Sequence, residues 1–422
     1  MKVPVLYFLL MLMSMLAQAQ DVQYFFAEAK KARQINDPAR FYEMIVKAGE
    51  LHPYHQSILY YRGLAAALTG RHEEAVEFLQ KAILIDAQFD LSVSELQSLK
   101  GTEPFENLKR QQQELTKPIV HSDTAFLISD RTLHPESIAA GEAGEFFVTS
   151  VHKRKIVKID RNGNRIDFTR EAQDGITALL GIKVDRSKKV LWACSSPMPE
   201  MENFDTVSRS AVFKYDLQSG KLLGKFIPAA SVKHSVFGDL ILNQKGEAFI
   251  SDSQSNTIFR VHESDQTLES YFTSKEFWNI QGIAFTPDEH YLYIADYVKG
   301  LFRLNTQTKE LTHVVAPPGI SLKGIDGLLC YDNALVAIQN GVSPIRVTRL
   351  TLSERGDTIT GHEIIDRNHP AFHEPTNGCV VGTTLYYIGN SQWSGYDENH
   401  QLKPLDQLQD VVILKVNLKE MQ

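Results

Sequence analysis

The chain has 422 residues, of which 43% are hydrophobic and 23% are charged, a composition typical of a soluble globular protein. A chain of this length is expected to form between one and three domains. The net charge of −7 excludes an overall attraction to nucleic acid or to an acidic membrane. The sequence also contains no stripe of basic residues that would attract either of them locally.

The first residues have the pattern of a signal peptide. Lys2 precedes an apolar run over residues 5–16, which is too short to span a bilayer comfortably. Ala17 and Ala19 are the small residues expected before a cleavage site. An uncleaved anchor is the alternative interpretation. We expect residues 1–19 to be removed, and the mature protein to be exported, periplasmic or secreted, without a membrane span.

Residues 21–115 are predicted to be helical, because apolar side chains recur at intervals of three and four. The spacing of small and apolar residues resembles the 34-residue tetratricopeptide repeat, in two degenerate units. Small residues suit close helix crossings at three positions of the second unit: Gly63, Ala75 and Ala82. Since about three units are usually needed for a stable array, we expect this segment to pack on the rest of the chain or on a partner protein.

From Pro118 onward the sequence repeats one pattern. In its clearest copy an apolar strand enters a turn at Pro287 and Asp288, and three further strands follow. The pattern begins six times, at Ser137, Gly181, Asp239, Gly282, Gly327 and Gly378. Four strands recurring at roughly 40–50 residues are typical of β-propeller blades. We therefore predict a mainly β chain: a six-bladed β-propeller over residues 118–422, with an N-terminal all-α tetratricopeptide-like helical segment.

The last copy of the pattern predicts how the ring closes. It supplies only three strands, at residues 378–381, 384–388 and 411–416. A further strand, at residues 124–129, lies ahead of the first copy and has no blade of its own. We predict that residues 124–129 pair with residues 411–416, because an unpaired edge strand would leave backbone groups without partners.

Three long loops, at residues 197–210, 367–375 and 391–409, are expected on one face of the propeller. The first strand of each blade begins at this face and the second strand ends there, so polar residues at these points surround the mouth of the central channel. Their oxygen atoms suit Ca²⁺ or a polar ligand. The candidate ligand-binding residues are His152, Asp239, Tyr297, Asn340, Asn377, Asn390 and Trp393.

A structural role is the alternative for several of these residues. Asp239 and Asn377 stand beside glycines at strand starts, where such side chains often cap turns by accepting bonds from backbone N–H groups. His152 can equally be a solvated surface residue. The three cysteines, Cys194, Cys330 and Cys379, have no metal-type spacing and are expected to be free thiols. The sequence contains no phosphate loop, dinucleotide fingerprint or Ser-His-Asp order.

Residues 125–416 resemble the gluconolactonase/regucalcin family of six-bladed propellers. The resemblance is carried by three motifs: His134-Pro135-Glu136-Ser137-Ile138, Gln281-Gly282-Ile283-Ala284-Phe285-Thr286-Pro287-Asp288 and Ile325-Asp326-Gly327-Leu328. It implies that Glu136, Gln281 and Asp326 bind one divalent metal, Ca²⁺ or another cation. It also implies that Asp326 is the general base of lactone hydrolysis. The sequence departs from the family pattern twice, since the metal-binding Asn is Gln281 here and a substrate-binding Asn is Gly238.

Two functions remain open at this point. In the first, the protein is a metal-dependent hydrolase of a lactone or ester, and its ligand is a small sugar-like molecule. In the second, it is a non-catalytic scaffold that binds a protein through the helical repeats and a peptide or glycan through the propeller. The fold cannot separate these hypotheses, because propellers serve both purposes.

Overall fold

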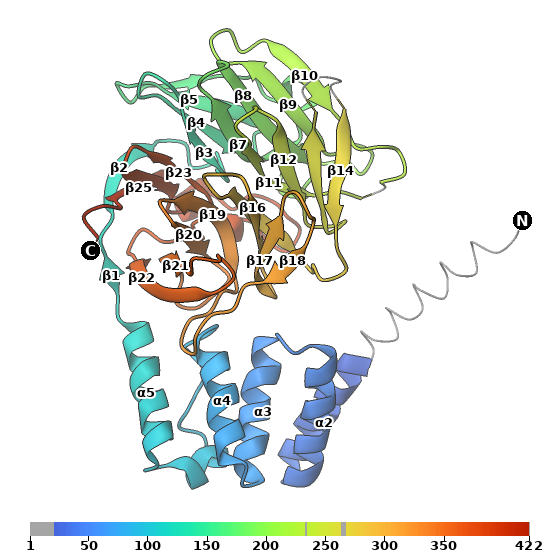
Figure 1. Cartoon of the computed structure of the whole chain (residues 1–422), viewed down its shortest axis with the longest axis vertical. Helices are drawn as coiled ribbons and strands as arrows, with labels where there is room; N and C mark the ends of the chain where they lie inside the picture. Colours follow the sequence, from blue (N-terminus) through green and yellow to red (C-terminus); the bar gives the residue numbers. More distant parts are fainter. Residues whose placement is uncertain (1–20, 233, 263–266, 422) are drawn as a thin grey trace, which may run out of the picture. The chain divides into compact units, whose positions relative to one another are not determined.

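The computed structural model describes residues 21–232, 234–262 and 267–421. The predicted signal peptide, residues 1–19, lies outside the described residues. The chain divides into two compact units at Pro118, and Gly319–Ser321 group with the first unit (Figure 1). Within the described part of the chain, no helix is long and apolar enough to cross a membrane.

The first unit is helical. Residues 21–34 are helical, followed by α2 (Pro38–Leu51), α3 (Gln56–Leu68), α4 (His72–Ile83), a 3-10 helix (Ser94–Leu99) and α5 (Glu103–Thr116). Asp37 caps α2 by accepting a bond from the Arg40 N–H. α3 and α4 cross closely, because a Cβ atom at Gly63 would lie 2.6 Å from Cγ of Leu79. The helical prediction is confirmed, whereas the tetratricopeptide assignment stays a prediction.

The second unit consists of six antiparallel sheets. The first three blades are β3 (Ile138–Ala140), β4 (Phe146–Ser150), β5 (Lys155–Ile159), β6 (Arg165–Asp167); β7 (Ala178–Asp185), β8 (Val190–Ser196), β9 (Ala211–Asp216), β10 (Leu222–Phe226); and β11 (Phe237–Leu242), β12 (Ala248–Asp252), β13 (Thr257–Val261), β14 (Leu268–Thr273). The fourth and fifth are β15 (Ile280–Phe285), β16 (Tyr291–Asp296), β17 (Gly300–Asn305), β18 (Leu311–His313); and β19 (Ile325–Tyr331), β20 (Ala334–Gln339), β21 (Arg346–Leu352), β22 (Ile359–Arg367). The sixth blade contains β23 (Gly378–Val381), β24 (Thr384–Ile388) and β25 (Val411–Asn417).

The six blades form a closed ring. Each inner strand packs on the next in the order β3, β7, β11, β15, β19 and β23, and β23 packs on β3. The sixth blade is completed by β2 (Asp123–Ile128), which pairs with β25 in antiparallel register. The six-bladed propeller and the predicted closure are therefore confirmed. One pairing was not predicted: β1 (Ile119–Val120) adds a fifth strand to the fifth blade beside β22.

The glycines of the repeated pattern let neighbouring inner strands approach closely. A Cβ atom at Gly327 would lie 2.3 Å from the Thr376 carbonyl oxygen, and one at Gly282 would lie 2.5 Å from the Asp326 carbonyl oxygen. No other residue fits at such distances without moving the backbone of the next blade. Gly181 makes a similar approach, with its Cβ position 3.0 Å from the Leu240 nitrogen of the third blade.

Gly327→Ala should destabilise the propeller by about 3 kcal/mol, since a methyl group has no space beside the Thr376 carbonyl. The matched control is Gly361→Ala in β22, where the nearest side-chain atom would lie 3.9 Å away. Urea denaturation of both variants measures the effect. Equal stability of the two variants would show that the close approach of inner strands is not needed.

All three cysteines are free thiols, as the sequence predicts. Cys194 is buried in β8, and burial raises its pKa. Burial likewise raises the pKa of Cys330 to about 11. These thiols are therefore protonated at neutral pH and are poor nucleophiles.

Candidate active site at the channel mouth

β-bulges place the candidate residues on the inner strands. The register of β11, β15 and β19 shifts at three positions named in the sequence analysis: Gly238, Gln281 and Asp326. A bulge leaves one residue outside the hydrogen-bond ladder and turns its side chain in a new direction. The side chains of these residues therefore do not have to alternate between the two faces of the strand at the point where it enters the channel.

Glu136 precedes the first inner strand and is held by the long loop of the sixth blade. The indole N–H of Trp393 donates a hydrogen bond of 2.9 Å to Oε2 of Glu136. Burial raises the pKa of Glu136 well above its usual range, and the negative charge of Asp326 raises it further, while the Trp393 bond opposes the shift. Two carboxyl groups from the first and fifth blades are therefore close enough to influence each other's protonation.

Asp326 is oriented by a chain of two hydrogen bonds. The hydroxyl of Tyr297 donates to Oδ1 of Asn340 over 2.9 Å, and Nδ2 of Asn340 donates to Oδ2 of Asp326 over 2.6 Å. Burial raises the pKa of Asp326 to about 6, although the Asn340 bond lowers it and the charge of Asp239 adds to the rise. Burial, followed by the charge of Asp326, also raises the pKa of Tyr297, which therefore stays a donor.

Asp239 and Asn377 are bonded to each other. Nδ2 of Asn377 donates to Oδ1 of Asp239 over 3.0 Å, and Lys183 Nζ lies 3.8 Å from the same oxygen. Because the third and sixth blades are opposite in a six-bladed ring, this bond crosses the channel. Oδ1 of Asn377 also accepts the N–H of Gly378 at 2.8 Å, which is the capping role considered for this residue. Both residues thus join opposite blades across the channel.

The side chain of Gln281 lies close to Gly238. Nε2 of Gln281 donates to Oδ1 of Asn279 over 2.6 Å. A Cβ atom at Gly238 would lie only 3.0 Å from Oε1 of Gln281. The longer side chain of Gln281 therefore reaches into the space that a side chain at position 238 would fill.

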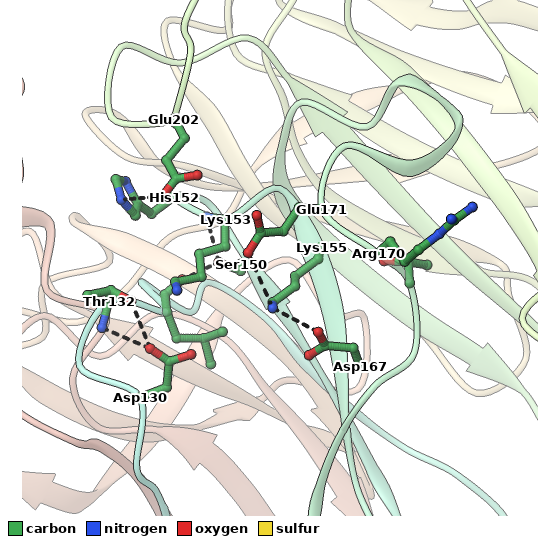
Figure 2. A network of polar contacts seen from close by, with 12 residues as sticks. Asp130, Thr132, Ser150, His152, Lys153, Lys155, Asp167, Arg170, Glu171 and Glu202 are labelled. Atoms are coloured by element: carbon green, nitrogen blue, oxygen red, sulfur yellow. Dashed lines mark hydrogen bonds and ion pairs between the residues drawn. The ribbon is translucent and has the colours of Figure 1, made fainter.

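Two candidate residues lie outside this cluster. Asn390 donates to the Asp410 carbonyl oxygen and accepts from the Val412 N–H, so its amide is used inside the sixth blade. His152 donates from Nδ1 to the Glu200 carbonyl oxygen at 2.8 Å and lies in a separate cleft, beside Glu202 in Figure 2.

The structure adds residues that the sequence analysis did not name. In addition to burial, the charge of Glu374 raises the pKa values of Glu136 and Tyr297. Glu374 lies in the loop between the fifth and sixth blades, which the sequence predicts on this face. Its place in that loop could therefore have identified it as a candidate site residue. His134 was quoted only as part of a motif. Its ring packs edge-on against Trp393 with centroids 4.4 Å apart, and burial lowers its pKa to about 3.

The oxygen donors fit a hard divalent cation in chemical type. In both Glu136 and Asp326, one carboxylate oxygen accepts a hydrogen bond from a neighbouring side chain. The second oxygen of each group accepts no hydrogen bond from the described residues. Oε1 of Gln281 is a further oxygen donor, and such sets suit Ca²⁺. In the described part of the chain, however, no three His, Cys, Asp or Glu side chains are grouped in a way that could hold a metal ion.

No protein-family model matches the chain, and no curated protein sequence does. Among solved structures, it is similar to a gluconolactonase from Xanthomonas campestris, at 13% identity over 70% of this chain and 93% of that one, with a TM-score of 0.47. It is similar to a PQQ-bound aldose sugar dehydrogenase from Streptomyces coelicolor, at 13% identity over 71% and 98%, with a TM-score of 0.48. It is also similar to a virginiamycin B lyase from Staphylococcus aureus, at 15% identity over 64% and 82%, with a TM-score of 0.43. Similarities this distant identify neither a reaction nor a substrate.

Proposed function

We propose that the protein hydrolyses a lactone or a similar ester at the channel mouth, with Asp326 as the general base. The observation that carries the proposal is the pair of enclosed carboxyl groups, Glu136 and Asp326, whose pKa values are both raised. Perturbed acids that share a cleft are typical of acid–base catalysis. With a pKa of about 6, Asp326 is ionised at neutral pH and basic enough to take a proton from water.

The neighbours of Asp326 support this role. Tyr297 fixes the amide of Asn340, so that Nδ2 of Asn340 faces one oxygen of Asp326. The second oxygen of Asp326 is then left to accept the proton. Trp393 holds Glu136 in the same way from the opposite side. Tyr297, Asn340 and Trp393 therefore act as positioning residues whose outer surfaces also contact a sugar-like substrate.

We include a divalent cation, Ca²⁺ or another, held by oxygen atoms of Glu136, Gln281 and Asp326. When bound, such a cation polarises an ester carbonyl and lowers the pKa of a coordinated water. Its positive charge would also remove the repulsion between the two carboxylates, which otherwise raises the pKa of Glu136. Export is part of the same proposal, because residues 1–19 have the pattern of a signal peptide.

The direct test is an activity screen of the purified mature protein. Hydrolysis of D-glucono-1,5-lactone and of a simple aryl ester would be followed by acid release, with millimolar CaCl₂, MnCl₂ or ZnCl₂ and with EDTA. Metal-stimulated hydrolysis is the expected result. If the protein hydrolyses neither substrate with any of these ions, the non-catalytic scaffold remains, in which the helical repeats bind a protein.

The pH dependence should identify the base. Since Asp326 must be ionised to accept a proton, kcat/KM should rise with pH and level off above about 6. The Asn340 hydrogen bond lowers the pKa of Asp326, so Asn340→Ala should move the inflection to higher pH. Initial rates between pH 4 and 9 measure both profiles. An inflection that is the same in the two proteins would assign it to another group.

A further inference from the structure

A second cleft lies on the loop-rich face, outside the carboxyl cluster. Its walls are the loop between β8 and β9 and the long loop between β24 and β25, with His152 after β4 at its base. Its volume is about 770 Å³, within the range typical of small-molecule sites. The cleft is therefore large enough for a ligand of several rings.

The walls of the cleft are joined before any ligand binds. Nδ1 of His400 lies 2.8 Å from Oε1 of Glu200, which connects the two loops. His152 donates from Nδ1 to the Glu200 carbonyl oxygen, and its own carbonyl oxygen accepts the Glu202 N–H at 3.0 Å. Because these loops are already ordered, a ligand binds without the entropic cost of ordering them.

The cleft presents a carboxylate, Glu202, beside the ring of His152. Because a carbonyl oxygen can only accept, Nδ1 of His152 carries a proton, and Nε2 of the same ring lies 3.4 Å from Oε1 of Glu202. Figure 2 shows this pair, with the imidazole directed at the carboxylate. The side chain of Glu202 is 40% exposed, so its carboxylate can accept hydrogen bonds from a ligand in the cleft. A ligand that carries hydrogen-bond donors fits this group.

The remaining lining narrows the ligand class. Phe204 lines the cleft, is 43% exposed and offers an apolar surface. Asn399 and Gln401 add amides that can donate as well as accept. None of the lining residues is Lys or Arg, which disfavours phosphates and other anions. Carboxylate, imidazole and amide groups around an exposed aromatic ring suit a molecule with many hydroxyl groups and an apolar ring face.

From these observations we infer that the cleft between the two long loops is a binding site for a neutral oligosaccharide. Sugar hydroxyls donate to the carboxylate of Glu202 and to the amide oxygens of Asn399 and Gln401, while a pyranose face packs on Phe204. The inference does not depend on the proposed hydrolase, because none of these groups belongs to the carboxyl cluster.

Isothermal titration calorimetry of the full mature protein tests the inference with three probes: maltotriose, cellotriose and N,N′,N″-triacetylchitotriose. At least one probe should bind. Glu202→Gln and Phe204→Ala should each weaken its Kd by at least about tenfold. The matched control is Glu398→Gln, an exposed residue of the loop between β24 and β25 that does not line the cleft and should leave Kd unchanged.

Asp326→Asn separates the cleft from the channel. It should leave oligosaccharide binding unchanged even if it removes hydrolysis. The inference is overturned if no probe binds at about 10 mM. It is equally overturned if Asp326→Asn removes binding while Glu202→Gln and Phe204→Ala do not, because the sugar would then occupy the channel mouth.

Discussion

Asp326→Asn should abolish lactone hydrolysis and leave the propeller folded. An amide has nearly the shape of the carboxyl group and can still accept the bond from Nδ2 of Asn340, but it cannot take a proton from water. Loss of a general base lowers kcat/KM by about 10²–10⁴-fold. The matched control is Asp288→Asn, because Asp288 accepts bonds from Thr286 and His290 in the turn between β15 and β16 and is not one of the candidate site residues.

The same variant tests the cation. If Glu136 and Asp326 hold a divalent ion, millimolar Ca²⁺ or another divalent ion should raise the melting temperature of the unmodified protein, and EDTA should reverse the rise. A ligand at 100 times its Kd stabilises the folded state by about 2.7 kcal/mol. Most of this gain should be missing in Asp326→Asn. Melting curves that respond to neither ion nor chelator in either protein would contradict the metal site.

The propeller could be predicted from the sequence because its blades are local and repeated. A turn such as the one at Pro287 and Asp288 needs only neighbouring residues, and six copies of one pattern make the assignment robust. The closure followed from counting strands, since residues 124–129 had no other partner. The structure places that strand at Asp123–Ile128, within one residue of the prediction at each end.

The site was harder to predict, because it depends on contacts between blades. Glu136, Asp326 and Trp393 were named from their places on strands and loops, and the structure brings them together. The local pattern contains no information on the relative register of two inner strands, so the bond between Asn377 and Asp239 across the channel could not be foreseen. Asn390 follows β24 and bonds its own blade instead, through the Asp410 carbonyl oxygen and the Val412 N–H.

Replacing β2 by a flexible glycine–serine segment of equal length should destabilise the whole propeller. β2 is the outer strand of the sixth blade, and its loss removes the ladder with β25 together with the burial of Ile128. A backbone hydrogen bond contributes about 1 kcal/mol, and burial of an isoleucine contributes about 1.5–3 kcal/mol. The total is comparable with the stability of a typical domain, about 5–15 kcal/mol.

The closing strand is also tied to the fifth blade. Asp366 accepts bonds from the N–H groups of His121 and Ser122 and from the Tyr387 hydroxyl, so the segment before β2 is held by both neighbouring blades. The matched control replaces β6 (Arg165–Asp167), an outer strand whose three residues are exposed and which does not close the ring. Differential scanning calorimetry should give a melting temperature at least about 10 °C lower for the β2 variant and a small change for the β6 variant. Equal melting temperatures would show that β2 does not hold the ring closed.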